Sequence, residues 1–219
     1  MWLPFDLYGI VIALPVIILA LTVHEYAHAV VADRLGDATP RLAGRLTLEP
    51  WVHLDPIGLM MIIFYRFGWA KPVPVNPNNM REPTKGLALS ALAGPLANVA
   101  LAAVFAVLMA FNVTRLAGPA VGPHLSRMVN SGVVINAGLA VFNLLPLPPL
   151  DGSRVLVYLA PVERWPWWST LQLYAPLVLL LVLLSGLGSI IVGAPANWLI
   201  QSLYRLAMSI ASLFNIGIW

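Results

Sequence analysis

Long apolar runs dominate the pattern of this chain, and five of them come close to the length that crosses a bilayer as a helix. About twenty apolar residues make one crossing. The first run ends at charged residues and a glycine, and the third ends at prolines, which stop a membrane helix. The predicted spans are residues 7–32, 86–111, 125–145, 171–192 and 196–214.

The region between the first two spans has a mixed pattern. Residues 41–48 alternate between apolar and polar or small positions, which predicts a strand or hairpin. Residues 56–69 are apolar but too few for a span, which favours a short re-entrant or interfacial segment. Three prolines in residues 71–77 forbid a helix and favour an extended chain. The predicted fold is therefore an all-α polytopic membrane protein with a small β element.

Composition supports this fold class. Of the 219 residues, 60% are hydrophobic and only 10% are charged, against about 25% charged in soluble domains. We expect a core in residues 1–160, two additional membrane helices in residues 161–219, and no separate soluble domain. Cysteine is absent, which excludes disulfides, thiolate zinc sites and cysteine nucleophiles.

The basic residues predict the orientation in the membrane. Seven of the twelve lysines and arginines lie between residues 33 and 86, after the first span. Basic loops face the cytoplasm, so we expect the N-terminus outside and, with five spans, the C-terminus in the cytoplasm. The net charge of +3 is small and placed for orientation, so no nucleic-acid partner is expected. A bacterial or archaeal cell membrane suits this asymmetry.

Two histidines and a glutamate interrupt the first apolar run, where polar groups are costly. His24 and His28 are four residues apart, so one helix face can present both imidazoles to one metal ion. A catalytic zinc takes three protein ligands and leaves a position open. Asp151 is the preferred third ligand because it follows the third span, on the same predicted side. Asp55 and Glu49 remain alternatives.

Glu25 is next to a ligand and suits a general base. Zinc lowers the pKa of its water to about 7, Glu25 takes the proton, and the hydroxide attacks a carbonyl. Zinc also stabilises the resulting oxyanion, and Glu25 then protonates the leaving amine. This pattern indicates a zinc metalloendopeptidase. The alternatives are a metal transporter or sensor that uses the same ligands, which gives Glu25 no role, and a polar cluster that joins helices.

Four segments together resemble the site-2 protease family of intramembrane zinc metalloproteases. The segment from His24 to His28 is similar to the family's zinc helix, and residues 143–152 match its Asn-x-x-Pro-x-Pro-x-Leu-Asp-Gly pattern. Residues 94–98 match a Gly-Pro-x-x-Asn element, and residues 53–58 with 68–77 resemble the loop and strand that follow the zinc helix. The resemblance covers residues 15–160. It implies one zinc per chain, with Asp151 as the third ligand.

The resemblance also implies the substrates and partners. Members of the family cut transmembrane segments in regulated intramembrane proteolysis, so the expected partners are a transmembrane protein or peptide and the lipid bilayer. Many relatives carry a PDZ or CBS domain, and a further helix often precedes the zinc helix; neither is expected here. The chain therefore resembles a minimal form, for which a separate regulatory membrane protein is an expected partner.

Four further residues are expected to contact substrate. Asn143 and Asn98 lie in or beside spans and either bond the substrate backbone or join helices. Val73 and Val75 lie in the extended segment, whose edge can pair with an unwound peptide by β-augmentation. The simpler interpretation of that segment is a proline-rich loop that covers the site.

Overall fold

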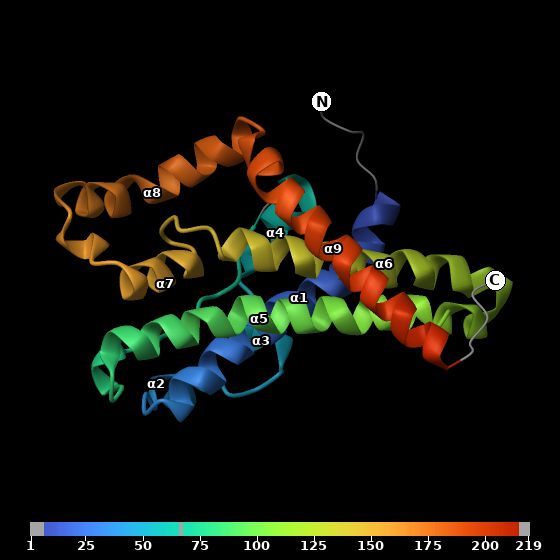
Figure 1. The fold of residues 1–219 in the computed structure, drawn as a ribbon, viewed down its shortest axis with the longest axis horizontal. Coiled ribbons are helices and arrows are strands. Elements are labelled where there is room, and N and C mark those ends of the chain that lie inside the picture. The colour runs from blue at the N-terminus through green and yellow to red at the C-terminus, as the bar shows by residue number, and fades with distance from the viewer. Residues whose placement is uncertain (1–6, 66–67, 215–219) are drawn as a thin grey trace.

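The structure is a computed structural model that describes residues 7–65 and 68–214, and all the regular secondary structure in that part of the chain is helical (Figure 1). Three long helices form the body of the molecule. The elements in chain order are α1 (Leu7–Arg34), α2 (Thr39–Leu42), α3 (Pro50–His53), α4 (Pro56–Tyr65), η1 (Pro77–Asn79), α5 (Pro83–Ala110), η2 (Val113–Ala117), α6 (Gly118–Asn143), α7 (Asp151–Leu159), η3 (Val162–Arg164), α8 (Pro166–Leu184) and α9 (Leu187–Leu213).

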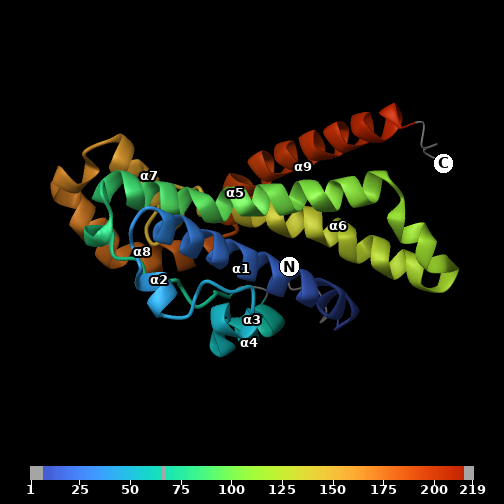
Figure 2. The ribbon, with the colours of Figure 1, turned by 90° about the horizontal axis from the view of Figure 1, so that it is seen from below.

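The helix α5 is the central element, because α1, α6, α7 and α9 all pack against it. In Figures 1 and 2, α5 and α6 lie side by side along the long axis of the molecule. Small residues make this packing close: Ala102 and Ala106 are fully buried, and Gly132 of α6 faces the ring of Phe105. A methyl group at Gly132 would lie 2.4 Å from Cγ of that ring. Small residues at helix interfaces are the usual means of close approach in lipid.

The first three predicted spans correspond to α1, α5 and α6, each of which is long and apolar enough to cross a membrane. The prediction of five spans is not confirmed. The helices α8 and α9 meet at Gly186 with a bend of 82°, and they pass the same test only as a pair. Gly186 has a φ of +77°, a left-handed conformation that ends α8 several residues before the break expected from sequence. The described part of the chain thus has three helices long and apolar enough to span a membrane, or four such spans if the bent pair counts as one.

This arrangement also changes the expected position of the C-terminal helix. The ring centroids of Phe214, after α9, and Phe111, after α5, are 5.9 Å apart. The start of α1 lies at the same end of the bundle, where the Tyr8 hydroxyl is 2.5 Å from Nδ1 of His124. Figure 2 shows the end of α9 beside this end of α5 and α6. The prediction of termini on opposite sides, which assumed five spans, is therefore not supported.

The segment between α1 and α5 departs from the predicted β element. Residues 41–48 form no strand. Instead, the helical turn α2 begins at Thr39 with Pro40 in its first turn, and Gly44, with a φ of +68°, follows its end. An isolated antiparallel bridge between Leu54 and Ala70 is the strand-like pairing found within the described ranges. The apolar segment predicted at 56–69 contains the ten-residue helix α4, and residues 66 and 67 of it lie outside the described residues.

The helix α7 was not predicted. It is an amphipathic helix of nine residues that begins at Asp151, directly after the proline-rich turn that ends α6, and it packs on α5. Gly152 lets the start of α7 lie against this turn, since a methyl group there would lie 2.2 Å from the carbonyl oxygen of Leu144. The turn and the glycine together bring the first residue of α7 back beside α1.

Candidate metal centre

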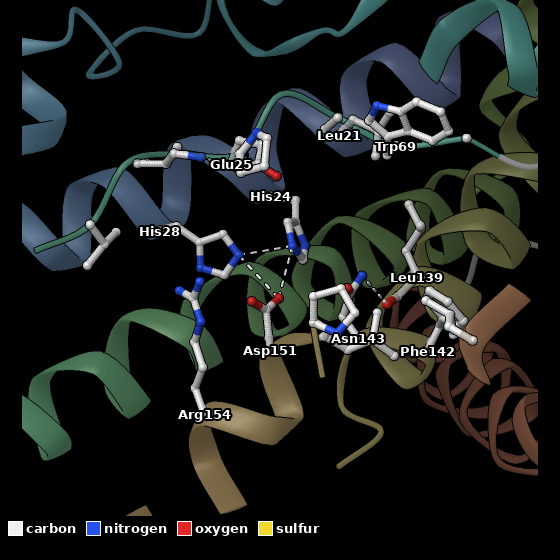
Figure 3. Close-up of a pocket in the computed structure, with 18 residues that line it drawn as sticks. Leu21, His24, Glu25, His28, Trp69, Leu139, Phe142, Asn143, Asp151 and Arg154 are labelled. Carbon is white, nitrogen blue, oxygen red and sulfur yellow. Dashed lines mark hydrogen bonds and ion pairs between the residues drawn. The ribbon is translucent and has the colours of Figure 1, made fainter. Parts of the chain in front are cut away.

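Three predicted ligand side chains meet at one point between α1, α5 and α7 (Figure 3). The Nε2 atoms of His24 and His28 are 3.0 Å apart. The Oδ2 atom of Asp151 lies 3.2 Å from each of them. All three side chains are largely enclosed, with 8%, 10% and 13% of their surfaces exposed.

The ring nitrogens on the far side fix which atoms face inward. Nδ1 of His24 lies 2.6 Å from Oδ1 of Asn98, and Nδ1 of His28 lies 2.6 Å from the carbonyl oxygen of Ser90. Both partners are acceptors. The Ser90 partner is a carbonyl oxygen, and the Asn98 side chain presents its oxygen to His24 because its amide nitrogen donates to other groups. Each Nδ1 therefore carries the proton, and each Nε2 presents a lone pair, as in histidines that bind metals.

The convergence of these atoms fits a bound cation. Two imidazole lone pairs and a carboxylate oxygen repel one another at 3.0–3.2 Å unless a positive charge lies between them. In the described part of the chain, Asp151 Oδ2 is buried and has no hydrogen-bond donor. Tetrahedral zinc at about 2.0–2.1 Å from nitrogen and oxygen ligands holds those ligands about 3.3 Å apart, close to the distances found here. The donor set thus fits zinc with one position left open.

One face of α5 supports the two histidines. Ser90, Gly94 and Asn98 recur at intervals of four residues, so they lie along the same face and against α1. Ser90 and Asn98 contact the two imidazoles, and Gly94 lies between them. A methyl group at Gly94 would be 2.4 Å from Nε2 of His28 and 2.6 Å from Cε1 of His24. The supporting role of Ser90 and Gly94 was missed, although the spacing with Asn98 was visible in the sequence.

Asn98 is fully buried at the helix interface. Its side-chain nitrogen donates to the carbonyl oxygen of Ala20, at 3.2 Å, and to Oδ1 of Asn136, at 2.8 Å. Its oxygen contacts His24. Asn98 of α5 thus hydrogen-bonds to both α1 and α6, as in the second of the two interpretations given for it from the sequence, a residue that joins helices. Asn143 lies elsewhere, at the end of α6, where it lines the cavity beside Asp151 (Figure 3).

The alternative third ligands lie outside the cluster that the described residues form. Oδ1 of Asp55 accepts a hydrogen bond of 2.8 Å from the backbone N–H of Gly58 and so caps α4. Glu49 is exposed and immediately precedes α3. The cluster of histidine and carboxylate atoms within reach of one ion consists of His24, His28 and Asp151.

Glu25 faces the extended segment from α1. Its Oε2 accepts a hydrogen bond of 3.0 Å from the backbone N–H of Val73. Figure 3 shows this carboxylate between α1 and the extended chain, above the histidines. Residues 71–76 lie outside any helix, in agreement with the extended chain predicted for residues 71–77, whereas Pro77 begins η1. Val73 is buried and Val75 is half-buried, and both line the cavity.

Two buried charges hold the extended segment in place. The guanidinium of Arg45 donates to the carbonyl oxygens of Lys71, at 3.1 Å, and Pro72, at 2.7 Å. Burial lowers the pKa of Arg45, while the nearby charge of Glu25 opposes that shift. Further along, Asp37 accepts a bond of 2.7 Å from the N–H of Asn76. These contacts fix the chain on both sides of Val73.

A cavity of about 290 Å³ opens beside the three converging atoms. It is mostly apolar, with the site histidines, Glu25, Asp151, Asn143 and Arg154 among its polar groups (Figure 3). Arg154, one turn after Asp151, was not singled out in the sequence. The apolar walls come from α1, the chain between residues 68 and 75, α6 and α8, through residues that include Leu21, Trp69, Leu139, Phe142 and Leu179. The arrangement can hold a metal ion and an extended apolar chain next to a carboxylate base.

The chain is similar to proteins whose names describe zinc metalloproteases. It is 38% identical over 185 residues to "Putative zinc metalloprotease YwhC" of Bacillus subtilis, a match that covers 83% of this chain and 84% of YwhC. It is 32% identical over 143 residues to "Putative zinc metalloprotease Rip2" of Mycobacterium tuberculosis, covering 64% of this chain and 53% of Rip2. A shorter match, 50% over 66 residues, is to "Putative zinc metalloprotease MJ0611" of Methanocaldococcus jannaschii, covering 30% of this chain and 31% of MJ0611. No family model and no solved structure matches the chain.

Proposed function

Because the chain belongs to the zinc metalloprotease family that includes YwhC, we propose that it is an intramembrane protease of the site-2 type. It hydrolyses peptide bonds in or near transmembrane segments of other membrane proteins. The observation that carries this proposal is the convergence of His24, His28 and Asp151 within a bundle of membrane-spanning helices, beside Glu25 and a cavity. His28 lies six residues before the end of α1, so at about 1.5 Å per residue the site is about 9 Å below the membrane surface.

We assign the catalytic base to Glu25 and the metal ligands to His24, His28 and Asp151. When bound, zinc supplies a Lewis acid that polarises a peptide carbonyl and lowers the pKa of a water molecule to about 7. The Glu25 carboxylate takes a proton from the attacking water and gives it to the leaving amine. The N–H of Val73 holds one oxygen of this carboxylate, which leaves the other for the water.

The cavity supports two substrate contacts. An extended chain sends the N–H groups of alternate residues to one edge, so Val73 and Val75 face the same edge, next to Glu25. Because Glu25 holds the Val73 N–H, an unwound substrate segment pairs with the other backbone groups of Val73 and Val75 on this edge, by β-augmentation. Asn143 uses one of its two amide N–H groups on the carbonyl oxygen of Leu139, at 3.0 Å, and can offer the second to a substrate carbonyl. For Asn98 we propose an orienting role on His24 in place of substrate contact.

The basic ends of α1 and α5 face the cytoplasm in this proposal, as the distribution of lysine and arginine favours. The start of α1 and the end of α9 then both lie on the outer side, since they pack at the opposite end of the bundle. The active site opens near the cytoplasmic face of a bacterial or archaeal cell membrane. A transporter or sensor is not favoured, because relatives carry metalloprotease names and such proteins have no use for Glu25.

The test compares cells that express the wild-type chain, Glu25→Gln or Glu163→Gln. Glu163 is an exposed glutamate in η3, outside the cavity, and serves as the matched control. New N-termini in the membrane fraction are identified by mass spectrometry. The proposal predicts fragments that end within transmembrane sequences. Their formation should require zinc, be lost in cells with Glu25→Gln and persist in cells with Glu163→Gln. Fragments that are unchanged in Glu25→Gln cells contradict the proposal.

A further inference from the structure

A second cavity, of about 300 Å³, lies where α1 ends and α5 begins, and it shares no lining residue with the cavity at the metal centre. Figures 1 and 2 show these two helix ends at the same end of the bundle. Arg34 is the last residue of α1, and Lys85 lies in the first turn of α5. Because both helices are membrane spans, this cavity lies at the boundary between the apolar core of the bilayer and the basic side.

The polar half of this cavity is cationic. It is lined by Arg34, Arg81 and Lys85, with Glu82 as the one acidic side chain among the lining residues. Glu82 is already paired with Lys85, at 3.0 Å. Within the described ranges no carboxylate pairs with Arg34 or Arg81, and both are exposed. The cavity therefore offers two uncompensated guanidinium groups to an anion.

The other half of the cavity is apolar and continues into the membrane. Leu35, Met80 and Leu89 line it. Leu89 lies four residues after Lys85 and Leu96 seven residues later, so all three are on one face of α5. Leu89 and Leu96 are 41% and 60% exposed, although they lie in a span, so this face contacts lipid. A cationic end followed by an apolar stripe matches a phospholipid in its natural orientation.

We propose that this cavity binds the phosphate headgroup of an anionic phospholipid, with an acyl chain along the Leu89 face of α5. Guanidinium groups bind phosphate oxygens in bidentate geometry, and basic pockets between membrane helices on the cytoplasmic side are typical sites for acidic lipids. The bound lipid joins the end of the zinc helix α1 to the start of the supporting helix α5. The proposal does not depend on the proteolytic activity.

The experiment measures lipid affinity with the full chain purified in a zwitterionic detergent. The thermal midpoint is followed as phosphatidylglycerol or phosphatidylcholine is added, because a ligand of the folded state raises the midpoint with its concentration. The variants are Arg34→Gln, Arg81→Gln and, as control, Arg164→Gln, an exposed arginine of η3 that does not line the cavity. Besides the two lipid titrations, a third titration uses millimolar inorganic phosphate in place of lipid.

We expect phosphatidylglycerol to stabilise the wild-type chain more than phosphatidylcholine does. Each cavity variant should lower the phosphatidylglycerol affinity about fivefold, the effect of one basic residue at an anionic surface, and Arg164→Gln should change it less than twofold. Equal effects of all three substitutions, or no preference for the anionic lipid, would overturn the proposal. Stabilisation by inorganic phosphate that the cavity variants abolish would also overturn it, since the ligand would then be a soluble anion.

Discussion

The substitution Gly94→Ala tests the packing of α5 against the zinc ligands. An ideal methyl group there lies 2.4 Å from Nε2 of His28, whereas carbon atoms in such positions essentially never approach closer than 3.0 Å. The histidine must therefore retreat by at least 0.6 Å, or the helices must separate by a similar distance. Metal–ligand distances tolerate about 0.2 Å. The displacement exceeds this tolerance, so the ligand atoms no longer fit one ion.

The expected result is a loss of zinc affinity of at least about 10–100-fold, the range seen when the groups that position metal ligands are removed. The assay is competition with a chelator of known affinity on the purified chain, with zinc content measured by elemental mass spectrometry. The control is Gly138→Ala on α6, where a methyl group meets nothing within 4 Å. Both changes raise helix propensity equally. Equal zinc affinities for the two variants would refute the proposed role of Gly94.

Three further predictions concern the ligands and their supports. Asp151→Asn removes the anionic oxygen while it keeps the shape, so zinc affinity should fall more than about 100-fold by the same chelator assay; unchanged zinc content would exclude Asp151 as a ligand. Asn98→Ala removes the acceptor for Nδ1 of His24 and should lower zinc affinity about 10–100-fold, and an affinity equal to wild type would show that α1 alone orients the ring. Burial would raise the pKa of Asp37, but the hydrogen bonds that it accepts outweigh burial and lower the pKa below 3.8. The Asp37 carboxylate thus stabilises the folded state above that pH, and this stabilisation is lost as the pH falls through the folded-state pKa. Asp37→Asn should therefore lower the free energy of unfolding by about 1–3 kcal/mol near pH 7 and by progressively less below pH 3.8, as measured by thermal unfolding. A stability difference between wild type and Asp37→Asn that grows as the pH falls would contradict this role of Asp37.

The sequence predicted the zinc helix and Asp151 because polar side chains are energetically costly within a membrane segment. Polar residues in an apolar run have few uses other than function, so His24, Glu25 and His28 stood out in the pattern alone. Asp151 followed from the requirement for a third ligand on the same side of the membrane. The three spans α1, α5 and α6 were equally visible, because a bilayer demands a fixed length of apolar helix.

Other features depend on tertiary contacts that a linear pattern does not contain. The carbonyl oxygen of Ser90 holds His28 through a backbone atom, which leaves no mark on residue type. Residues 41–48 alternate like a strand, but Pro40 and Gly44 make a tight helical turn there. The last two helices were divided at the wrong position because Gly186 ends α8 inside an otherwise continuous apolar run. Local backbone preferences decided both corrections.

The central claim is that His24, His28 and Asp151 hold one zinc ion for hydrolysis. The most direct measurement is an anomalous difference map at the zinc absorption edge, from crystals of the purified, zinc-loaded chain. The account predicts one strong peak between Nε2 of the two histidines and the Asp151 carboxylate, retained in Glu25→Gln. Zinc bound elsewhere in the chain, with no peak among these three side chains, would contradict it.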